Sequence, residues 1–142
     1  MQRYTIKEAS KLSGLPQSTL RYYEKMGLIA PIVRDLSSGH RSYEENDLDF
    51  ITALSCLNAT GMSIVDMRAY LSNMRLGLQS ADQQIKILQT QKKHLAEEAK
   101  QIALKQRYLE VKVSYWKAMA SGNTLEAHTI GQHAHSIAKE LK

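Results

Sequence analysis

The sequence predicts a mainly α-helical protein: an N-terminal winged helix-turn-helix with a small β-hairpin wing, a helical linker and a long C-terminal coiled-coil helix. Three observations lead to this fold class. Two short helical patterns near the N-terminus are separated by a glycine-containing turn. Residues 82–119 contain no proline or glycine and repeat their apolar residues every seven positions. Positive charge is concentrated in the first third of the chain.

The composition is that of a folded protein with one modest core. The chain has 142 residues, of which 43% are hydrophobic and 23% charged, and this balance excludes a disordered or fibrous chain. We find no apolar run long enough to cross a membrane and no export signal, so we expect a cytoplasmic protein with no membrane partner. The single cysteine, Cys56, excludes an intrachain disulfide and a cysteine-rich metal site within one chain.

The distribution of charge indicates an anionic partner such as nucleic acid. The chain carries a net charge of +5, and its pI is near 9.3. Residues 1–43 contribute +4 of this charge, and the remaining 99 residues are almost neutral. Nearly all the attraction for an anion therefore comes from the segment that holds the predicted helix-turn-helix.

The first two helices are predicted from their caps and their spacing. Residues 5–13 have apolar side chains at helical intervals, with Thr5 as the N-cap and Glu8 completing a capping box. Gly14 ends this helix. A second helix follows over residues 17–26 and ends at Gly27.

Residues 28–45 predict an exposed two-stranded wing. Short apolar runs flank a turn-prone Ser-Ser-Gly, and Pro31 argues against a central strand. Asn46 or Asp47 is then expected to cap a third helix over residues 48–60, which Gly61 ends. A fourth helix should begin at Ser63 and stop at Gly77.

The heptad repeat predicts a helix about 55 Å long that dimerises through one line of side chains. Lys92 and Gln106 interrupt the a positions, where they specify register or favour antiparallel pairing. Packing against the protein's own chain is the alternative interpretation, but the linker offers too little surface to cover such a length. The expected dimerisation residues are Ile85, Leu88, Leu95, Ala99, Ile102, Leu109, Val113 and Trp116.

We therefore divide the chain into residues 1–78, the DNA-binding domain with its helical linker, 79–119, the dimerisation helix, and 120–142, a short tail. The tail opens with a Ser-Gly-Asn break and has room for one more short helix. It is too short to form a ligand-binding domain.

The second helix carries the residues best suited to contact DNA. The first turns of a recognition helix present side chains to base edges, which places Ser18, Thr19 and Arg21 well. Tyr22 shares their face, whereas Tyr23 turns partly toward the core and is either a contact or a packing residue. In the wing, Arg34, His40, Arg41 and Tyr43 supply donors for the DNA backbone. Arg41 has an alternative role in pairing with Glu24 to hold the wing against the helix.

Taken together, LRYYEKMGLI at residues 20–29, GHRSY at 39–43 and GMS at 61–63, followed by the heptad helix, resemble the MerR family of bacterial transcription regulators over residues 1 to about 118. The resemblance implies a homodimer, joined by an antiparallel coiled coil, on an inverted repeat in double-stranded promoter DNA. It also implies that the dimer distorts the promoter spacer so that RNA polymerase can engage. The residues expected to contact DNA are Tyr4, Ser18, Thr19, Arg21, Tyr22, Tyr23, Arg34, His40, Arg41 and Tyr43.

The effector class depends on Cys56. This residue lies about 130° from the apolar stripe of its helix, and it is either a packing residue or a reactive thiol. The chain is similar to the short single-cysteine MerR branch that responds to aldehydes and other electrophiles, which makes Cys56 a sensor candidate. His128, His133 and His135 in the tail lack an accompanying cysteine, so we predict no metal site and no cofactor.

The sequence also bears on two other function classes. The sequence contains no phosphate-binding glycine loop and no recognisable catalytic constellation, so we do not expect an enzyme. An architectural protein that anchors DNA through the same two modules, without an effector, is the alternative function. Promoter-specific binding with distortion of the spacer would distinguish the regulator from this alternative.

Overall fold

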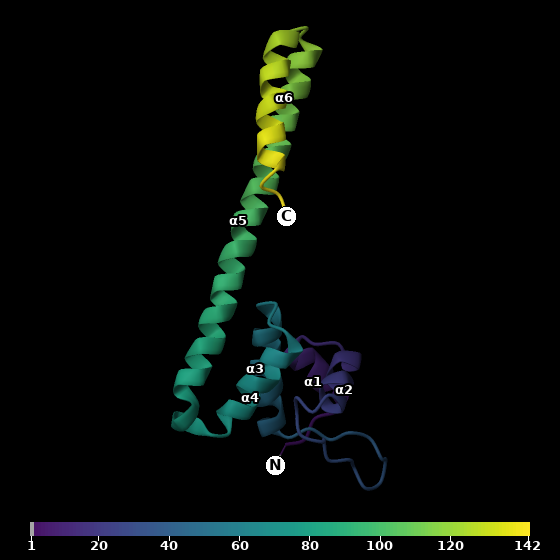
Figure 1. Ribbon diagram of the computed structural model, residues 1–142. Helices are drawn as coiled ribbons and strands as arrows, with labels where there is room; N and C mark the ends of the chain where they lie inside the picture. Colours follow the sequence, from purple (N-terminus) through teal and green to yellow (C-terminus); the bar gives the residue numbers. More distant parts are fainter. Residues whose placement is uncertain (1) are drawn as a thin grey trace. The chain divides into compact units, whose positions relative to one another are not determined.

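The computed structural model describes residues 2–142, and its regular structure is almost entirely helical (Figure 1). By contacts the chain divides into an N-terminal unit that ends at Gln91 and a second unit, Lys92–Lys142. None of the described helices combines the length and apolarity that a membrane crossing requires. The elements are α1 (Ile6–Ser13), α2 (Gln17–Lys25), α3 (Glu45–Ala59), α4 (Ile64–Met74), the 3-10 turn η1 (Gly77–Ser80), α5 (Ala81–Ala120) and α6 (Thr124–Ala138).

Local sequence signals account for α1 and α2. The Thr5 hydroxyl accepts from the backbone N–H of Glu8, whose carboxylate accepts from the N–H of Thr5, and this confirms the predicted capping box. Gly14, at φ 75°, ends α1 in the left-handed region that favours glycine. The turn that follows brings α2 against α1 and completes the helix-turn-helix.

The third helix starts earlier than the sequence predicts. We expected a cap at Asn46 or Asp47, but α3 begins at Glu45 with Glu44 as its N-cap. The Asp47 carboxylate accepts from the backbone N–H of Glu44 at 2.8 Å, so Asp47 lies in the first turn and satisfies the cap from inside the helix. The fourth helix begins as predicted, because the Ser63 hydroxyl accepts from the N–H of Asp66.

Helices α1 to α4 enclose the core of the N-terminal unit. Leu20 of α2 and Ile51 and Leu54 of α3 are completely buried, and Met67 and Leu71 of α4 pack against the same cluster. Ile87 of α5 also packs on it, so the first turns of the long helix contribute to this unit. Burial of such side chains is the main source of stability in a domain of this size.

The wing forms a loop rather than a regular hairpin. It contains an antiparallel bridge between Arg34 and Arg41, and a second bridge joins Tyr4 to Tyr43. Neither extends into a named strand within residues 2–142. Two backbone bonds flank the first bridge, from the Asp35 N–H to the His40 carbonyl and from the Ser42 N–H to the Val33 carbonyl, each at 2.8 Å.

In the second unit, α6 returns antiparallel to α5 and lies beside it (Figure 1). Val111 of α5 is buried against Ala134 and Ile137 of α6, and Ala127 and Ala118 are buried in the same unit. Gly131 of α6 faces Tyr115 of α5, because a Cβ at position 131 would lie 3.5 Å from the Tyr115 ring, at ordinary contact distance. The short helix that we expected in the tail is thus present.

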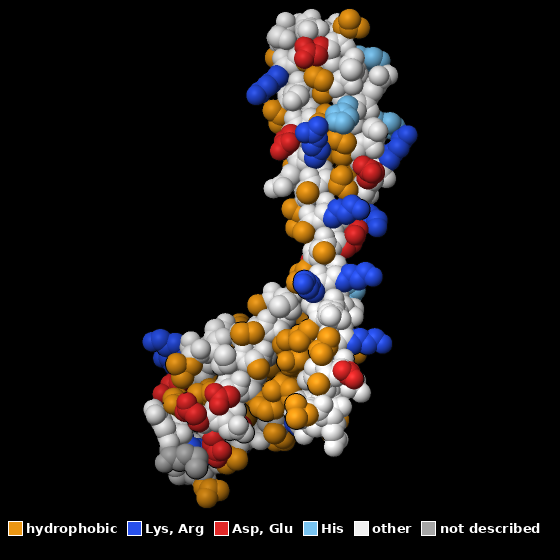
Figure 2. Space-filling model, turned by 90° about the vertical axis from the view of Figure 1, so that its left-hand side faces the viewer, with side chains coloured by type: hydrophobic (Ala, Val, Ile, Leu, Met, Phe, Trp, Pro, Cys, Tyr) orange, Lys and Arg blue, Asp and Glu red, His pale blue; other side chains and the backbone are white. Residues whose placement is uncertain are grey.

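The helix α6 covers one face of α5 and leaves the predicted dimerisation line on the opposite face. At 100° per residue, Val111 and Ala118 lie roughly opposite Ile102 and Leu109. Hydrophobic side chains are visible along the exposed face of α5 in Figure 2. The exposed members of the line are Ile85, Leu88, Leu95, Ile102, Leu109, Val113 and Trp116.

Candidate nucleic-acid interface

A basic basin lies between α1, α2 and the wing, with a volume of about 570 Å³. One carboxylate, that of Asp35, lines it together with many cationic side chains. A concave surface of this charge concentrates anions and focuses the field on them. The basic residues of its lining are Arg3, Lys7, Arg21, Arg34, His40 and Arg41.

Helix α2 contributes Arg21 to the lining of this basin, and its exposed face extends beyond it. Ser18 and Arg21 are exposed, Thr19 is half-buried and Tyr22 is 43% exposed. Arg21 makes only a long 3.5 Å contact to Gln17, so its guanidinium can reach a ligand. Pro16 precedes α2 and has no polar side chain to cap it, and the first amide groups of the helix therefore suit a phosphate oxygen.

The wing presents Arg34 and His40 to the basin and is ordered by Asp35. The Arg34 guanidinium donates to the Gly39 carbonyl at 2.9 Å, which holds this side chain along the turn. The Asp35 carboxylate accepts from the Ser37 hydroxyl and from the backbone N–H groups of Ser38 and Ser37, and these bonds lower the pKa of Asp35 to about 2. The negative charge of Asp35 is therefore stabilised by hydrogen bonds from Ser37 and Ser38 in the same turn.

Arg41 pairs with Glu24. Its Nε donates to the Glu24 carboxylate at 2.8 Å, and both side chains are about one-fifth exposed. This bond joins the wing to the last turn of α2. It is the pairing that the sequence analysis gave as the alternative role of Arg41. Arg41 also lines the basin, so the same side chain can position the wing and face a phosphate.

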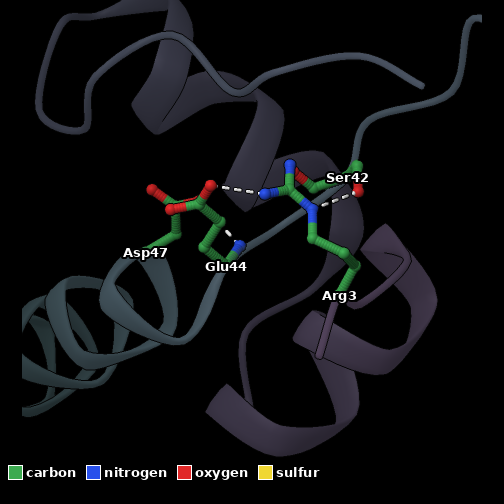
Figure 3. A network of polar contacts seen from close by, with 4 residues as sticks. All are labelled: Arg3, Ser42, Glu44 and Asp47. Atoms are coloured by element: carbon green, nitrogen blue, oxygen red, sulfur yellow. Dashed lines mark hydrogen bonds and ion pairs between the residues drawn. The ribbon is translucent and has the colours of Figure 1, made fainter. Parts of the chain in front are cut away.

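The segment before α1 is fastened to the end of the wing by Arg3 (Figure 3). The Arg3 guanidinium forms an ion pair with Glu44, and it donates to the Ser42 hydroxyl at 2.9 Å and to the Ser42 carbonyl at 3.0 Å. Arg3 contributes to the positive charge of residues 1–43, but the sequence analysis did not include it among the expected DNA contacts. Beside it, the Tyr4 hydroxyl donates to Glu45 at 2.9 Å, and this bond raises the pKa of Tyr4.

Two tyrosines that we expected at the interface lie in the core. Tyr43 is completely buried and Tyr23 is 3% exposed, and burial raises the pKa of each. The expectation that they contact DNA is corrected by this burial. Both have packing roles, because a core bounded by short helices needs large side chains to fill it.

The buried Tyr43 hydroxyl leads to a stability prediction. This hydroxyl finds no hydrogen-bond partner among residues 2–142. Burying a polar group without a partner costs free energy, so we expect Tyr43→Phe to raise the free energy of unfolding by about 1 kcal/mol. Urea denaturation of both proteins would measure this. A less stable variant would contradict the prediction and indicate that a bound water satisfies the hydroxyl.

Cys56 is exposed on α3, between the buried Leu54 and Leu57. Its predicted position off the apolar stripe is thus confirmed. One turn further along α3, the Thr60 carbonyl accepts from Gln91 Nε2 of α5 at 2.8 Å. The thiol therefore lies close to the point where the first turns of the long helix are attached to α3.

The tail histidines lie on α6 without forming a metal centre. His128 and Gln132 approach each other at 3.4 Å, and His128, His133 and His135 are exposed. No group of three or more histidine, cysteine, aspartate or glutamate side chains within the described chain is placed to hold a metal ion. His128 and His135 share one side of α6, and His133 lies on another side, so the three imidazoles do not converge.

A family model and two similar curated proteins all describe transcriptional regulators. A family model described as "MerR HTH family regulatory protein" matches residues 4–74. An uncharacterised helix-turn-helix transcriptional regulator from Haemophilus influenzae is 32% identical over 124 residues, which cover 84% of this chain and 89% of that protein. A second protein from the same organism, whose name describes a heavy metal-dependent transcriptional regulator, is 36% identical over 118 residues, covering 83% of this chain and 88% of its own length.

A solved structure shares the architecture. The crystal structure of HiNmlR, a MerR family regulator lacking the sensor domain, bound to promoter DNA, aligns with a TM-score of 0.70 and 27% sequence identity. The alignment covers 89% of this chain and 96% of that one. The match therefore includes the long helix as well as the N-terminal helices.

Proposed function

Because the chain belongs to the MerR family of helix-turn-helix regulatory proteins, we propose that it binds promoter DNA as a homodimer and regulates transcription from that promoter. The observation that carries the proposal is the basic basin between α2 and the wing. Its cations have the chemistry to neutralise phosphates on either side of a groove. The promoter DNA in the HiNmlR structure supports the same assignment.

In this proposal α2 enters the major groove and the wing follows the backbone. Arg21 is the residue suited to a base, since a guanidinium can donate two parallel bonds to guanine. Ser18, Thr19 and Tyr22 donate to phosphates or base edges, while Arg34, His40 and Arg41 contact the backbone. Tyr4, which borders the basin, is a further contact.

The homodimer is proposed from the exposed line on α5. One protomer supplies a single recognition helix, whereas two protomers related by a two-fold axis would contact the two halves of an inverted repeat. The apolar line, which includes Leu95, Ile102 and Leu109, is the natural surface for that contact, because α6 already covers the opposite face. We assign dimerisation to residues 79–119 and propose that the coil is antiparallel.

Regulation would then act through the shape of DNA. A dimer that bends and untwists the promoter spacer brings the two promoter elements into a position that RNA polymerase can engage, and this uses binding energy for deformation. A regulator that acts on promoter DNA with RNA polymerase would work in the cytoplasm, which is the location we propose. Footprinting and topoisomer assays on a bound promoter test this proposal. Sequence-indifferent protection without untwisting would favour the architectural alternative.

We further propose that Cys56 senses aldehydes or related electrophiles. The thiolate sulfur would add to an aldehyde carbonyl carbon to form a C–S bond while the C=O π bond opens, and the oxygen that receives this electron pair would take a proton from water to give a hemithioacetal. The adduct would add bulk one helical turn before Thr60, whose carbonyl binds Gln91. Bulk at this position could change how α5 is attached to α3 and thereby the shape of the bound DNA.

Transcription in vitro tests the sensor. Formaldehyde, methylglyoxal or a quinone should change the output of the promoter with the wild-type protein, and the response should be lost in Cys56→Ser. A zinc salt forms a separate arm, because one relative is named for heavy metals. Equal responses of wild type and variant to the electrophiles would contradict the sensor role of Cys56 and leave the DNA-binding proposal intact.

A further inference from the structure

Three long side chains connect the helices of the N-terminal unit through backbone carbonyls. Arg68 of α4 donates from Nη2 to the Met26 carbonyl at 2.8 Å. Gln84 of α5 donates to the Tyr70 carbonyl of α4 at 2.8 Å, and Gln91 donates to that of Thr60 at the same distance. These bonds join residues that are far apart in the sequence, so they reflect the packing of the helices rather than local structure.

The bond from Arg68 is made at the end of the candidate recognition helix. Met26 is the C-cap of α2, and the last carbonyls of a helix have no partner within it. A cation is also favoured there, because the C-terminal end of the helix dipole is negative. Arg68 thus satisfies α2 from a neighbouring helix that Met67 and Leu71 anchor in the core.

The bond from Gln84 continues this connection to the long helix. Tyr70 lies two residues after Arg68 on α4, so one rigid helix carries both contacts. The bond from Nε2 holds the Gln84 amide at this place, while its Oε1 is buried and has no hydrogen-bond partner within residues 2–142. A buried polar atom left in this state is a cost that the packing of the helices must offset.

From these contacts we propose that Arg68 is a positioning residue for DNA recognition, an inference that rests on the proposed DNA-binding function. By holding the C-terminal end of α2 to α4, it sets the angle at which α2 enters the groove. Helix α2 is short and is fixed in the core at Leu20 and Tyr23, so a tilt of the helix about these two side chains moves the turn that carries Ser18 and Arg21. The Gln84 bond makes this angle depend on the position of the first turns of α5.

The proposal differs from two simpler roles of an exposed arginine. A phosphate contact would contribute equally to every DNA sequence and to the salt dependence of binding. A purely structural contact would contribute to the stability of the fold alone. A positioning residue contributes to selectivity, because it places the side chains that contact the bases.

The test measures selectivity, salt dependence and stability together. The wild-type chain first selects a duplex from a random library, and its affinity for that duplex and for a scrambled one is measured over a range of salt. We expect Arg68→Ala to lose roughly three- to tenfold in affinity for the selected duplex, with little loss on the scrambled one and an unchanged salt slope. Arg68→Lys should recover part of the loss, since an ammonium can still donate to the Met26 carbonyl. Arg75→Ala, which removes an exposed arginine at the end of α4, is the charge-matched control.

Two results would overturn the inference. Equal losses on both duplexes with a salt slope smaller by about 1 would assign Arg68 to a phosphate. A lower melting temperature with an unchanged ratio of affinities would assign it to stability alone. If the wild-type chain selects no sequence at all, the proposed function fails instead, so the two failures are distinguishable.

A second pair of variants tests the link to α5. Gln84→Ala should reduce selectivity in the same direction as Arg68→Ala, whereas Gln83→Ala, which removes an exposed amide from the same helix, should not. Both variants interrupt one connection, so the double variant should lose less than the product of the two single losses. Independent, multiplicative losses would overturn the part of the proposal that concerns Gln84.

Discussion

Replacing both Ile102 and Leu109 with glutamate is expected to convert the proposed dimer into a monomer that no longer protects an inverted repeat. Both side chains lie on the exposed line of α5, at 55% and 62% exposure in the single chain. Each substitution removes about 1.5–3 kcal/mol of free energy from burial of an apolar side chain. The two substitutions in each of two protomers would also bring four carboxylates into one interface. We expect the dimer dissociation constant to rise by at least about a thousandfold. Sedimentation equilibrium at micromolar concentration measures this.

The control for this variant adds the same two carboxylates to each chain on a different face. Ala96→Glu with Ala103→Glu places them seven residues apart on an exposed line of α5, roughly 100° to 120° around the helix from Ile102. The net charge changes by the same amount as in the first variant, yet this control should remain a dimer. A dimer for the Ile102 and Leu109 variant would show that another surface joins the protomers.

Arg21→Ala is expected to have the next largest effect, on affinity and discrimination together. Arg21 is exposed, borders the basic basin and makes only one long contact within the protein. If its guanidinium contacts a guanine, its loss should cost about 1–3 kcal/mol on the selected duplex and should relax the preference at one base position. Affinity measurements on a set of single-base variants of the duplex locate that position.

Lys25→Ala is the matched control for Arg21, since Lys25 is an exposed cation in the last turn of the same helix. Its removal should weaken binding to all sequences by a similar factor. A uniform loss for Arg21→Ala as well would mean that Arg21 contacts a phosphate and that α2 finds its sequence through other residues.

Features set by neighbouring residues could be predicted from the sequence. The capping box of Thr5 and Glu8, the Ser63 cap and the stop at Gly14 each depend on side chains a few residues apart. The heptad line also followed from its period, and the exposure of Cys56 followed from its angle on the helix. The predicted start of α3 was wrong because Asp47 accepts the backbone N–H of the N-cap Glu44 from inside the first turn. A search for an N-cap residue overlooks this arrangement.

Features that depend on packing could not be predicted in the same way. The helical angles turned Tyr23 partly toward the core but left its role open between contact and packing, and the surrounding core decides that Tyr23 is buried while Tyr22 remains exposed. The bond from Arg68 to Met26 spans 42 residues and has no local signal. The stripe that α6 covers was present in the sequence, at Val111 and Ala118. Only the antiparallel packing of α6 on α5 shows that this stripe has a partner within the chain.

The position of α6 has a spectroscopic consequence. Because α6 covers the opposite face of α5, the only tryptophan of the chain, Trp116, is left 62% exposed on the proposed dimer line. Its indole is in water in a separate protomer and would be largely removed from water between two. Intrinsic fluorescence at shorter wavelengths would then accompany assembly, so the native chain contains its own optical reporter of the dimer.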